Sequence, residues 1–97
     1  MNVIARRALA SFWKAHPDAA APLSAWYRIA RRARWNSFAD VRKTFNSVDQ
    51  VAGSKLVFNI GGNNYRLVVL AAYRSQRLFV LWVGTHAQYD QIDVAKL

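Results

Sequence analysis

The sequence predicts an α+β domain, with helices in its first half and a small, mainly antiparallel sheet in its second half. Residues 6–45 are rich in Ala, Arg and Trp, and their large apolar side chains recur at helical spacing. Residues 56–83 are rich in Val, Leu, Phe and Tyr, which favour strands. With 97 residues, 54% of them hydrophobic, the chain is long enough for one domain that spans residues 1–97.

Three helical segments are expected before residue 46, after a short edge strand at residues 3–5. The first helix ends at the His16-Pro17 pair, and the second has Pro22 in its first turn. A third, short helix reaches about Phe45, because Ser37 precedes Asp40 by three residues, a variant of the capping box. The apolar stripes are Leu9, Phe12 and Trp13 in the first helix and Leu23, Trp26, Tyr27 and Ala30 in the second, whose other side carries Arg28, Arg31 and Arg32.

Three strands are expected at residues 56–60, 65–73 and 78–83, joined by turns at 61–64 and 75–76. The first turn consists of two glycines and two asparagines, which tolerate positive φ and are typical of hairpins. The strands are apolar at nearly every position, so both faces need cover, from helices on one side and partly from a partner on the other. Thr85 and Gln88 have the spacing of a capping box and predict a terminal helix that runs through Ile92.

The charge of the chain indicates a polyanionic partner. Fourteen Lys and Arg stand against five Asp and no Glu, which gives a net charge of +9. Nucleic acid, an anionic membrane surface or an acidic protein would each satisfy this surplus. The absence of Cys excludes disulfides and cysteine-built zinc sites, and with two separated His and few carboxylates we expect no metal and no other cofactor. No segment resembles a signal peptide or a membrane span, so a cytoplasmic protein is expected.

Polar side chains are expected to meet at one end of the sheet. Two short hairpin turns place Asn59 opposite Arg66, Arg66 opposite Thr85, and Tyr65 opposite His86. Tyr89 follows one helical turn later. An amide, a guanidinium, an imidazole and a phenol beside a helix N-terminus together predict a phosphate-binding site. This placement depends on the register, because a slip of one residue turns a side chain to the opposite face.

Each of these residues also has a structural interpretation. An Asn next to two glycines, such as Asn59, often stabilises a turn through its side chain. His86 could simply be exposed, and Tyr89 could simply pack against its neighbours. Arg66 in an apolar central strand needs a partner, and an external anion is a reasonable one because carboxylates are so few. The same shortage, with no Glu for helix-stabilising pairs, favours an anionic partner, of which RNA is one, over a merely solvated face for the basic segment Arg28, Arg31, Arg32 and Arg34.

Two blocks of sequence, residues 57–67 and 84–90, resemble the signature blocks of HigB-type toxins. The helix around Trp26-Tyr27 and the segment at 38–41 are also similar to that family, so the resemblance covers nearly the whole chain. It implies a RelE-like fold and an mRNA interferase of a type II toxin–antitoxin system, which arrests growth by cutting mRNA, in many members on the translating ribosome. It also implies inhibition by a HigA-type helix-turn-helix antitoxin.

The functional positions of the family carry over by resemblance to Asn59, Arg66, His86 and Tyr89. Lys55 lies just outside the first block, although strand alternation places it on the same face as Asn59. RelE-like toxins often concentrate Lys and Arg around the scissile phosphate, whereas this chain has few Lys near the expected site. Its division of acid and base roles is therefore open.

The chemistry that we expect is metal-independent cleavage in which the 2′-OH of the RNA attacks the adjacent phosphorus. His86 is assigned to proton transfer, Arg66 to the phosphate, Asn59 to an orienting hydrogen bond and Tyr89 to base stacking or proton transfer, and His86 and Tyr89 could exchange roles. The main alternative is a non-catalytic RNA- or ribosome-binding module. A DNA-binding regulator ranks lower for want of a clear helix-turn-helix, and action at a membrane surface ranks last.

Overall fold

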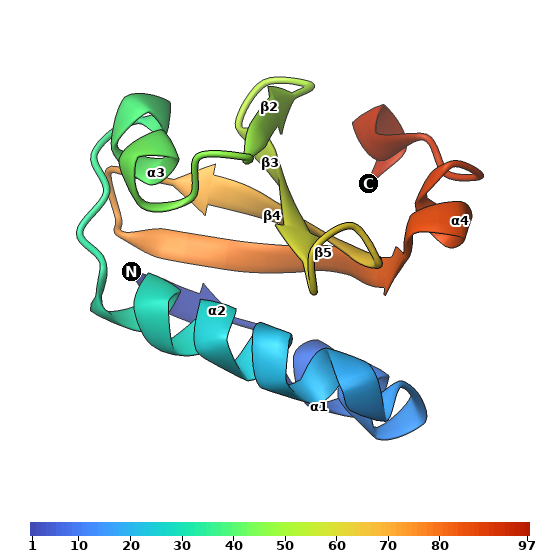
Figure 1. Ribbon diagram of the computed structural model, residues 1–97. Coiled ribbons are helices and arrows are strands. Elements are labelled where there is room, and N and C mark those ends of the chain that lie inside the picture. The colour runs from blue at the N-terminus through green and yellow to red at the C-terminus, as the bar shows by residue number, and fades with distance from the viewer.

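The computed structural model describes all residues from 1 to 97, with helices and strands in an α+β arrangement (Figure 1). The first half is mainly helical and the second half forms most of the sheet, as the composition predicts. Single 3₁₀ turns at Pro17–Ala19 and Val94–Lys96 supplement the regular elements. In chain order these are β1 (Asn2–Ile4), α1 (Arg6–Ala15), α2 (Ala20–Arg32), α3 (Phe38–Thr44), β2 (Asp49–Val51), β3 (Lys55–Ile60), β4 (Tyr65–Ala72), β5 (Arg77–Thr85) and α4 (His86–Tyr89).

The five strands form one mixed sheet in the order β1-β5-β4-β3-β2. The strands from β2 to β5 are antiparallel to their neighbours, and β1 adds to the edge of β5 in parallel. Because β1 pairs only with Arg77 to Phe79, the later half of β5 has no strand beside it on that edge. Helix α1 packs against β5 there and takes the place of a further strand.

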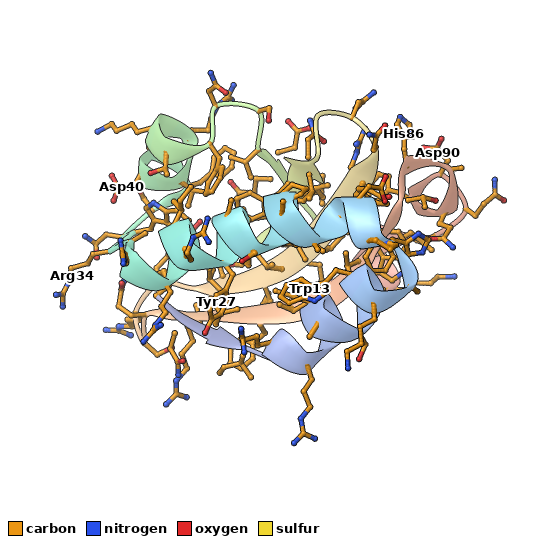
Figure 2. All side chains as sticks on the ribbon, turned by 60° about the horizontal axis from the view of Figure 1, so that its bottom comes forward. Trp13, Tyr27, Arg34, Asp40, His86 and Asp90 are labelled. Atoms are coloured by element: carbon orange, nitrogen blue, oxygen red, sulfur yellow. The ribbon has the colours of Figure 1, made fainter.

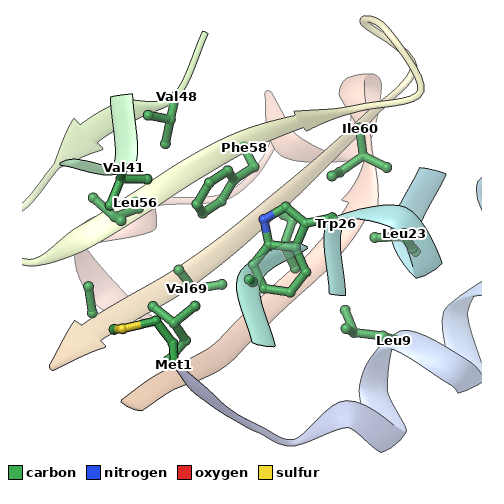
Figure 3. Close-up of a cluster of buried hydrophobic side chains, with 14 of the residues drawn as sticks. Met1, Leu9, Leu23, Trp26, Val41, Val48, Leu56, Phe58, Ile60 and Val69 are labelled. Carbon is green, nitrogen blue, oxygen red and sulfur yellow. The ribbon is translucent and has the colours of Figure 1, made fainter. Parts of the chain in front are cut away.

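The hydrophobic core lies between one face of the sheet and helices α1 and α2 (Figures 1 and 3). Trp26 of α2 is 1% exposed, and its ring meets the ring of Phe58 on β3 at 5.4 Å between centroids. Leu9 of α1 and Leu23 of α2 are fully buried in the same cluster. These are residues of the expected apolar stripes, so periodicity identified the buried face of both helices correctly.

The second face of the sheet is covered in part by the chain itself. Val57 and Val68 are buried, although they alternate with the residues that face the helices. The C-terminal segment lies on this side, because the ammonium of Lys55 donates hydrogen bonds to the carbonyls of Val94, Ala95 and Leu97 at 2.8–3.1 Å. Leu70 and Phe79, opposite each other on this face, remain half-buried.

Two capping arrangements are confirmed, while other details differ from the expectation. Ser37 caps α3, and Thr85 and Gln88 form a complete capping box at the start of α4. Helix α4 nevertheless ends at Tyr89 and does not reach Ile92, because the N–H groups of Gln91 and Ile92 donate to carbonyls three residues back instead of four. Strand β2 was not expected, since two of its three residues are polar and it lies at the edge of the sheet. None of the helices combines the length and the apolar composition needed to cross a membrane.

Candidate active site

Asn59 and Arg66 lie directly opposite each other on β3 and β4, as the sequence predicts. The four-residue turn at 61–64 sets this register, with Gly61 and Gly62 both at positive φ. Directly paired residues project from the same face of a sheet. Both side chains therefore lie on the face away from α1 and α2, at the end of the sheet where β5 leads into α4.

The expected pairing of Arg66 with Thr85 is wrong by one residue. Arg66 lies opposite Gly84, and Tyr65 lies opposite Thr85, not opposite His86. The turn between β4 and β5 comprises residues 73–76 and is centred earlier than expected, which moves the partner of Arg66 back by two residues, and a bulge in β5 near residue 81 moves it forward again by one. Gln76 adopts positive φ, and its amide donates to the carbonyls of Trp35 and Tyr73, which stabilises this turn. Gly84 thus brings no side chain next to Arg66.

His86 is joined to the hairpin that precedes Arg66. Its backbone N–H donates to the carbonyl of Asn64 at 2.9 Å, so the start of α4 is fixed beside the β3–β4 turn. Its side chain is 42% exposed, and Nδ1 lies 3.4 Å from a carboxylate oxygen of Asp90 (Figure 2). The imidazole is thus open to a substrate and has an acidic neighbour. Sequence reasoning missed Asp90, although the i,i+4 spacing in an expected helix would have indicated it.

The guanidinium of Arg66 has a neutral partner within the chain. It donates to the side-chain oxygen of Asn63 at 2.7 Å and to the carbonyls of Asn63 and Tyr65 at 3.3 Å. No Lys or Arg side chain in the molecule forms an ion pair with the side chain of an Asp. The positive charge of Arg66 is therefore unneutralised. Asn63, and not Asn59, stabilises the turn, while the exposed Asn59 side chain makes no hydrogen bond within the chain.

Tyr89 packs near an aromatic residue that the sequence did not single out. Its ring centroid is 6.0 Å from that of Trp82 on β5. The Trp82 indole lies over Gly84, where an added Cβ would come within 2.4 Å of Trp82 Cη2. Gly84 is the residue opposite Arg66, so the Trp82 side chain lies between Arg66 and Tyr89 of α4. The Trp-x-Gly spacing, which places two residues on one face of a strand, is the signal that could have identified Trp82.

Lys55 is kept apart from the polar row formed by Asn59, Arg66, His86 and Tyr89. It shares a face with Asn59, but four residues along one strand correspond to about 13 Å. Its ammonium is occupied by the C-terminal carbonyls described above. The structure therefore places Lys55 at the other end of β3, where it holds the C-terminal segment.

The four arginines assigned to RNA are all exposed, but they lie far from the polar row. Figure 2 shows Arg34 and His86 at opposite ends of the molecule. Strand β5, with nine residues, connects the two ends and corresponds to roughly 30 Å. Arg31, Arg32 and Arg34 line a cavity of about 460 Å³ together with the first two residues and the β4–β5 turn, whereas Arg28 lies outside it.

The N-terminal amino group lies at this basic cavity and donates to the carbonyls of Arg31 and Ala33. Partial burial and the nearby charge of Arg34 lower the pKa of this amino group. Arg31, Arg32, Arg34 and this amino group gather here with no carboxylate among the residues that line the cavity. Such a surface attracts phosphate groups.

The fold and the polar row define a small α+β protein with a basic surface suited to phosphate groups. Comparison with known proteins assigns its family. Residues 19–92 match the model of the HigB toxins, described as the RelE-like toxic component of a toxin–antitoxin system, so the chain belongs to this family. It is 24% identical over 94 residues to an mRNA interferase HigB of Escherichia coli O6:H1 (strain CFT073), covering 95% of this chain and 91% of that protein. The mRNA interferase toxin HigB of Escherichia coli K12 is 27% identical over 92 residues, covering 93% and 88%.

Proposed function

We propose that the protein is an endoribonuclease that cleaves mRNA and thereby inhibits translation, as the toxin of its toxin–antitoxin system. One observation carries the proposal: an unneutralised guanidinium, Arg66, lies opposite Asn59 at the sheet end where the exposed imidazole of His86 begins α4. A cation, a hydrogen-bond donor and an acid–base group are what cleavage of a phosphodiester requires. The names of the relatives, which are mRNA interferases, supply mRNA as the substrate.

In the proposed reaction, the ribose 2′-oxygen forms a bond to the adjacent phosphorus while the bond from phosphorus to the 5′-oxygen breaks. The products are a 2′,3′-cyclic phosphate and a 5′-OH. One side chain takes the proton of the 2′-OH, and another gives a proton to the leaving 5′-oxygen. His86 performs one of these transfers, and Tyr89 either performs the other or stacks on a base. The mechanism is metal-independent, because the attacking oxygen belongs to the substrate and Arg66 supplies the positive charge.

Arg66 and Asn59 act on the phosphate itself. The guanidinium stabilises the charge that develops on the phosphorane, and the Asn59 amide orients a phosphate oxygen. In the free protein, Asn63 holds the guanidinium on the outer face of the sheet. A phosphate competes well for it, because it brings a negative charge and can accept two parallel N–H bonds from the guanidinium, whereas the Asn63 amide is neutral.

The partners in this proposal follow from the family and from the charge. The antitoxin is a HigA-type protein with a helix-turn-helix, and both proteins act in the cytoplasm. The RNA contacts include the exposed arginines Arg28, Arg31, Arg32 and Arg34, and the ribosome presents mRNA to the toxin. Lys55 is not among these contacts, because its ammonium already donates three hydrogen bonds to the C-terminal segment. Since none of these arginines is paired with a carboxylate, each retains a full charge for RNA phosphates.

Mapping of RNA 5′ ends in cells that express the protein tests the proposal. Wild type is expected to arrest growth and to create new 5′ ends within mRNA, whereas His86→Ala and Arg66→Ala do neither. Lys43→Gln, on the exposed side of α3, is the control and retains both effects. New ends that carry 5′-OH, with a 2′,3′-cyclic phosphate on the upstream fragment, support attack by the 2′-OH. Growth arrest without new ends would overturn the nuclease and favour an RNA- or ribosome-binding module.

A further inference from the structure

A second cavity lies beside the polar row and has the opposite character to the basic one. Its volume is about 530 Å³, which is within the range of small-ligand sites. It opens at the edge of β5 that β1 leaves unpaired, between the end of α1 and helix α4 with the turn that follows. No Lys, Arg, Asp or Glu lines it. Its lining includes Phe12, His16, Trp82, Gln88, Gln91 and Ile92.

One wall of this cavity is a fixed aromatic stack. The rings of Phe12 and His16 are stacked, with 4.3 Å between centroids and 24° between planes. Both meet the ring of Tyr65 edge-on, at 5.6 and 5.9 Å. Tyr65 is 6% exposed, and its hydroxyl donates to Asp18 at 2.5 Å. The stack is thus held in place before any ligand arrives, which lowers the entropic cost of binding.

The opposite wall offers free amide groups. Gln88 uses its side-chain oxygen to accept the Thr85 N–H at 2.9 Å, so its NH₂ group makes no hydrogen bond within the chain. The side chain of Gln91 makes none at all, and it is exposed at the cavity. Primary amides present a donor and an acceptor side by side, which is the pattern that reads the edge of a base.

Trp82 joins this cavity to the polar row. Its indole lines the cavity, lies over Gly84 opposite Arg66, and packs near Tyr89. When a phosphate of an RNA strand lies at Arg66, the nucleotide next to that phosphate therefore lies close to the cavity. The cavity has no Lys or Arg side chain to bind a phosphate. A nucleobase is a flat, neutral ring with polar edges, so it fits both the aromatic wall and the amide wall.

We propose that this cavity binds one nucleobase next to the scissile phosphate, stacked against Phe12, His16 or Trp82 and read by Gln88 and Gln91. The inference rests on the proposed nuclease function and deepens it, because it gives the enzyme a preference for the base at one position beside the cut. Base stacking of this kind changes binding by about tenfold or more when an aromatic residue is removed.

Sequencing of the new 5′ ends tests the base preference in cells. The variants are Gln91→Leu, which keeps the size of the side chain but removes its amide, and Phe12→Leu. The control is Asn46→Ala, which removes an exposed amide far along the chain from this cavity. We expect wild type and the control to share a preference at one position beside the cut, and both cavity variants to lose it. Retention of the wild-type preference by both variants would overturn the cavity while leaving the nuclease intact.

A binding measurement separates the cavity from the chemistry. The probe is a single-stranded RNA with the preferred sequence whose scissile nucleotide carries 2′-deoxyribose, so that the 2′-OH attack cannot occur. Wild type is expected to bind it roughly tenfold more tightly than an otherwise identical strand that lacks the base at the read position. Trp82→Leu and Gln91→Leu should abolish this difference. If wild type makes the distinction but never cleaves RNA, the cavity stands and the nuclease fails; no distinction in wild type overturns the cavity.

Discussion

The imidazole Nδ1 of His86 lies 3.4 Å from a carboxylate oxygen of Asp90, one helical turn further along α4. This is the only contact between a side-chain carboxylate and a basic side chain within 4.0 Å in the molecule, and both side chains are exposed, His86 by 42% and Asp90 by 59%. An exposed pair of this kind contributes little to stability. The contact with Asp90 instead limits the orientations of the His86 imidazole within the polar row.

Removal of His86 should therefore separate catalysis from folding. His86→Ala is expected to lower the rate of RNA cleavage by about 10²–10⁴-fold, the usual effect of losing an acid–base group. The change in unfolding free energy should stay within about 0.5 kcal/mol, because an exposed side chain is removed. Single-turnover cleavage and chemical denaturation measure the two quantities. A large loss of stability would mean that His86 is structural.

Asp90 should act through His86 as a positioning residue. Asp90→Asn is expected to reduce the cleavage rate by less than His86→Ala does, and mainly through kcat, because the imidazole is still present but less restrained. Asp90→Glu should restore part of the loss, since a carboxylate returns. In a His86→Ala background the Asp90 substitution should have no further effect, and an additive loss would contradict the assignment.

Gly84 should tolerate no side chain. In Gly84→Ala the new Cβ would lie 2.4 Å from Trp82 and 2.8 Å from the Gln88 side-chain oxygen, so the indole and the capping box must both shift. We expect a loss of about 1–3 kcal/mol in unfolding free energy, together with reduced cleavage. Gly62→Asn is the control, because Gly62 has open space around it and Asn tolerates its positive φ. Thermal denaturation compares the two variants.

Two tyrosines should make the protein less stable in alkali. The hydrogen bond to Asp18, with burial, raises the pKa of Tyr65 above its ordinary value of 10, and burial with the nearby Asp40 charge raises that of Tyr73. The folded state thus keeps both phenols protonated after the unfolded chain begins to lose these protons. The contribution of these two phenols to the unfolding free energy is fully present below pH 10 and is lost as the pH rises through their folded-state pKa values. Denaturation by urea at neutral pH and above pH 10 measures the loss.

The same two tyrosines should respond differently to loss of the hydroxyl. Tyr65→Phe removes the hydrogen bond to Asp18 and should destabilise the protein. The Tyr73 hydroxyl is buried without a partner, so Tyr73→Phe is expected to be neutral or stabilising. The alkaline loss of stability should shrink in both variants. A destabilised Tyr73→Phe protein would show that this hydroxyl has a partner, such as a bound water.

The basic cavity should govern the salt dependence of RNA binding. Arg31→Gln and Arg34→Gln are each expected to weaken binding of single-stranded RNA for all sequences alike, and to lower the slope of log affinity against log salt by about one. Arg7→Gln, exposed at the start of α1, is the control of equal charge. Equal effects of all three substitutions would indicate attraction by net charge alone.

Local sequence patterns correctly predicted those features of the fold that depend on residues close together in the chain. The stripes around Leu9 and Trp26, both capping motifs and the Asn59–Arg66 pairing follow from spacing within one helix or one tight turn. The pairing of Arg66 with Gly84 did not follow, because a bulge in β5 and a turn held by the carbonyl of Trp35 set that register. Both depend on contacts between distant segments.

The candidate site was predictable to a similar extent. His86 and Tyr89 follow a recognisable helix start, and Arg66 stands out as a charge in an apolar strand. The surroundings of Lys55 could not be foreseen, because its partners lie about forty residues away in the C-terminal segment. The neutral cavity was equally hidden, since α1, β5 and α4 each contribute to its lining.

The parallel pairing of β1 with β5 has a consequence for the order of synthesis. Asn2 pairs with Arg77, so the strand that leads into the polar row gains its edge neighbour only after most of the chain has left the ribosome. Contacts between such distant segments form late and slowly, because a long loop must close first. The N-terminal strand therefore stays unpaired until residues 77–79 have been synthesised, and the complete sheet forms only after β1 has joined β5.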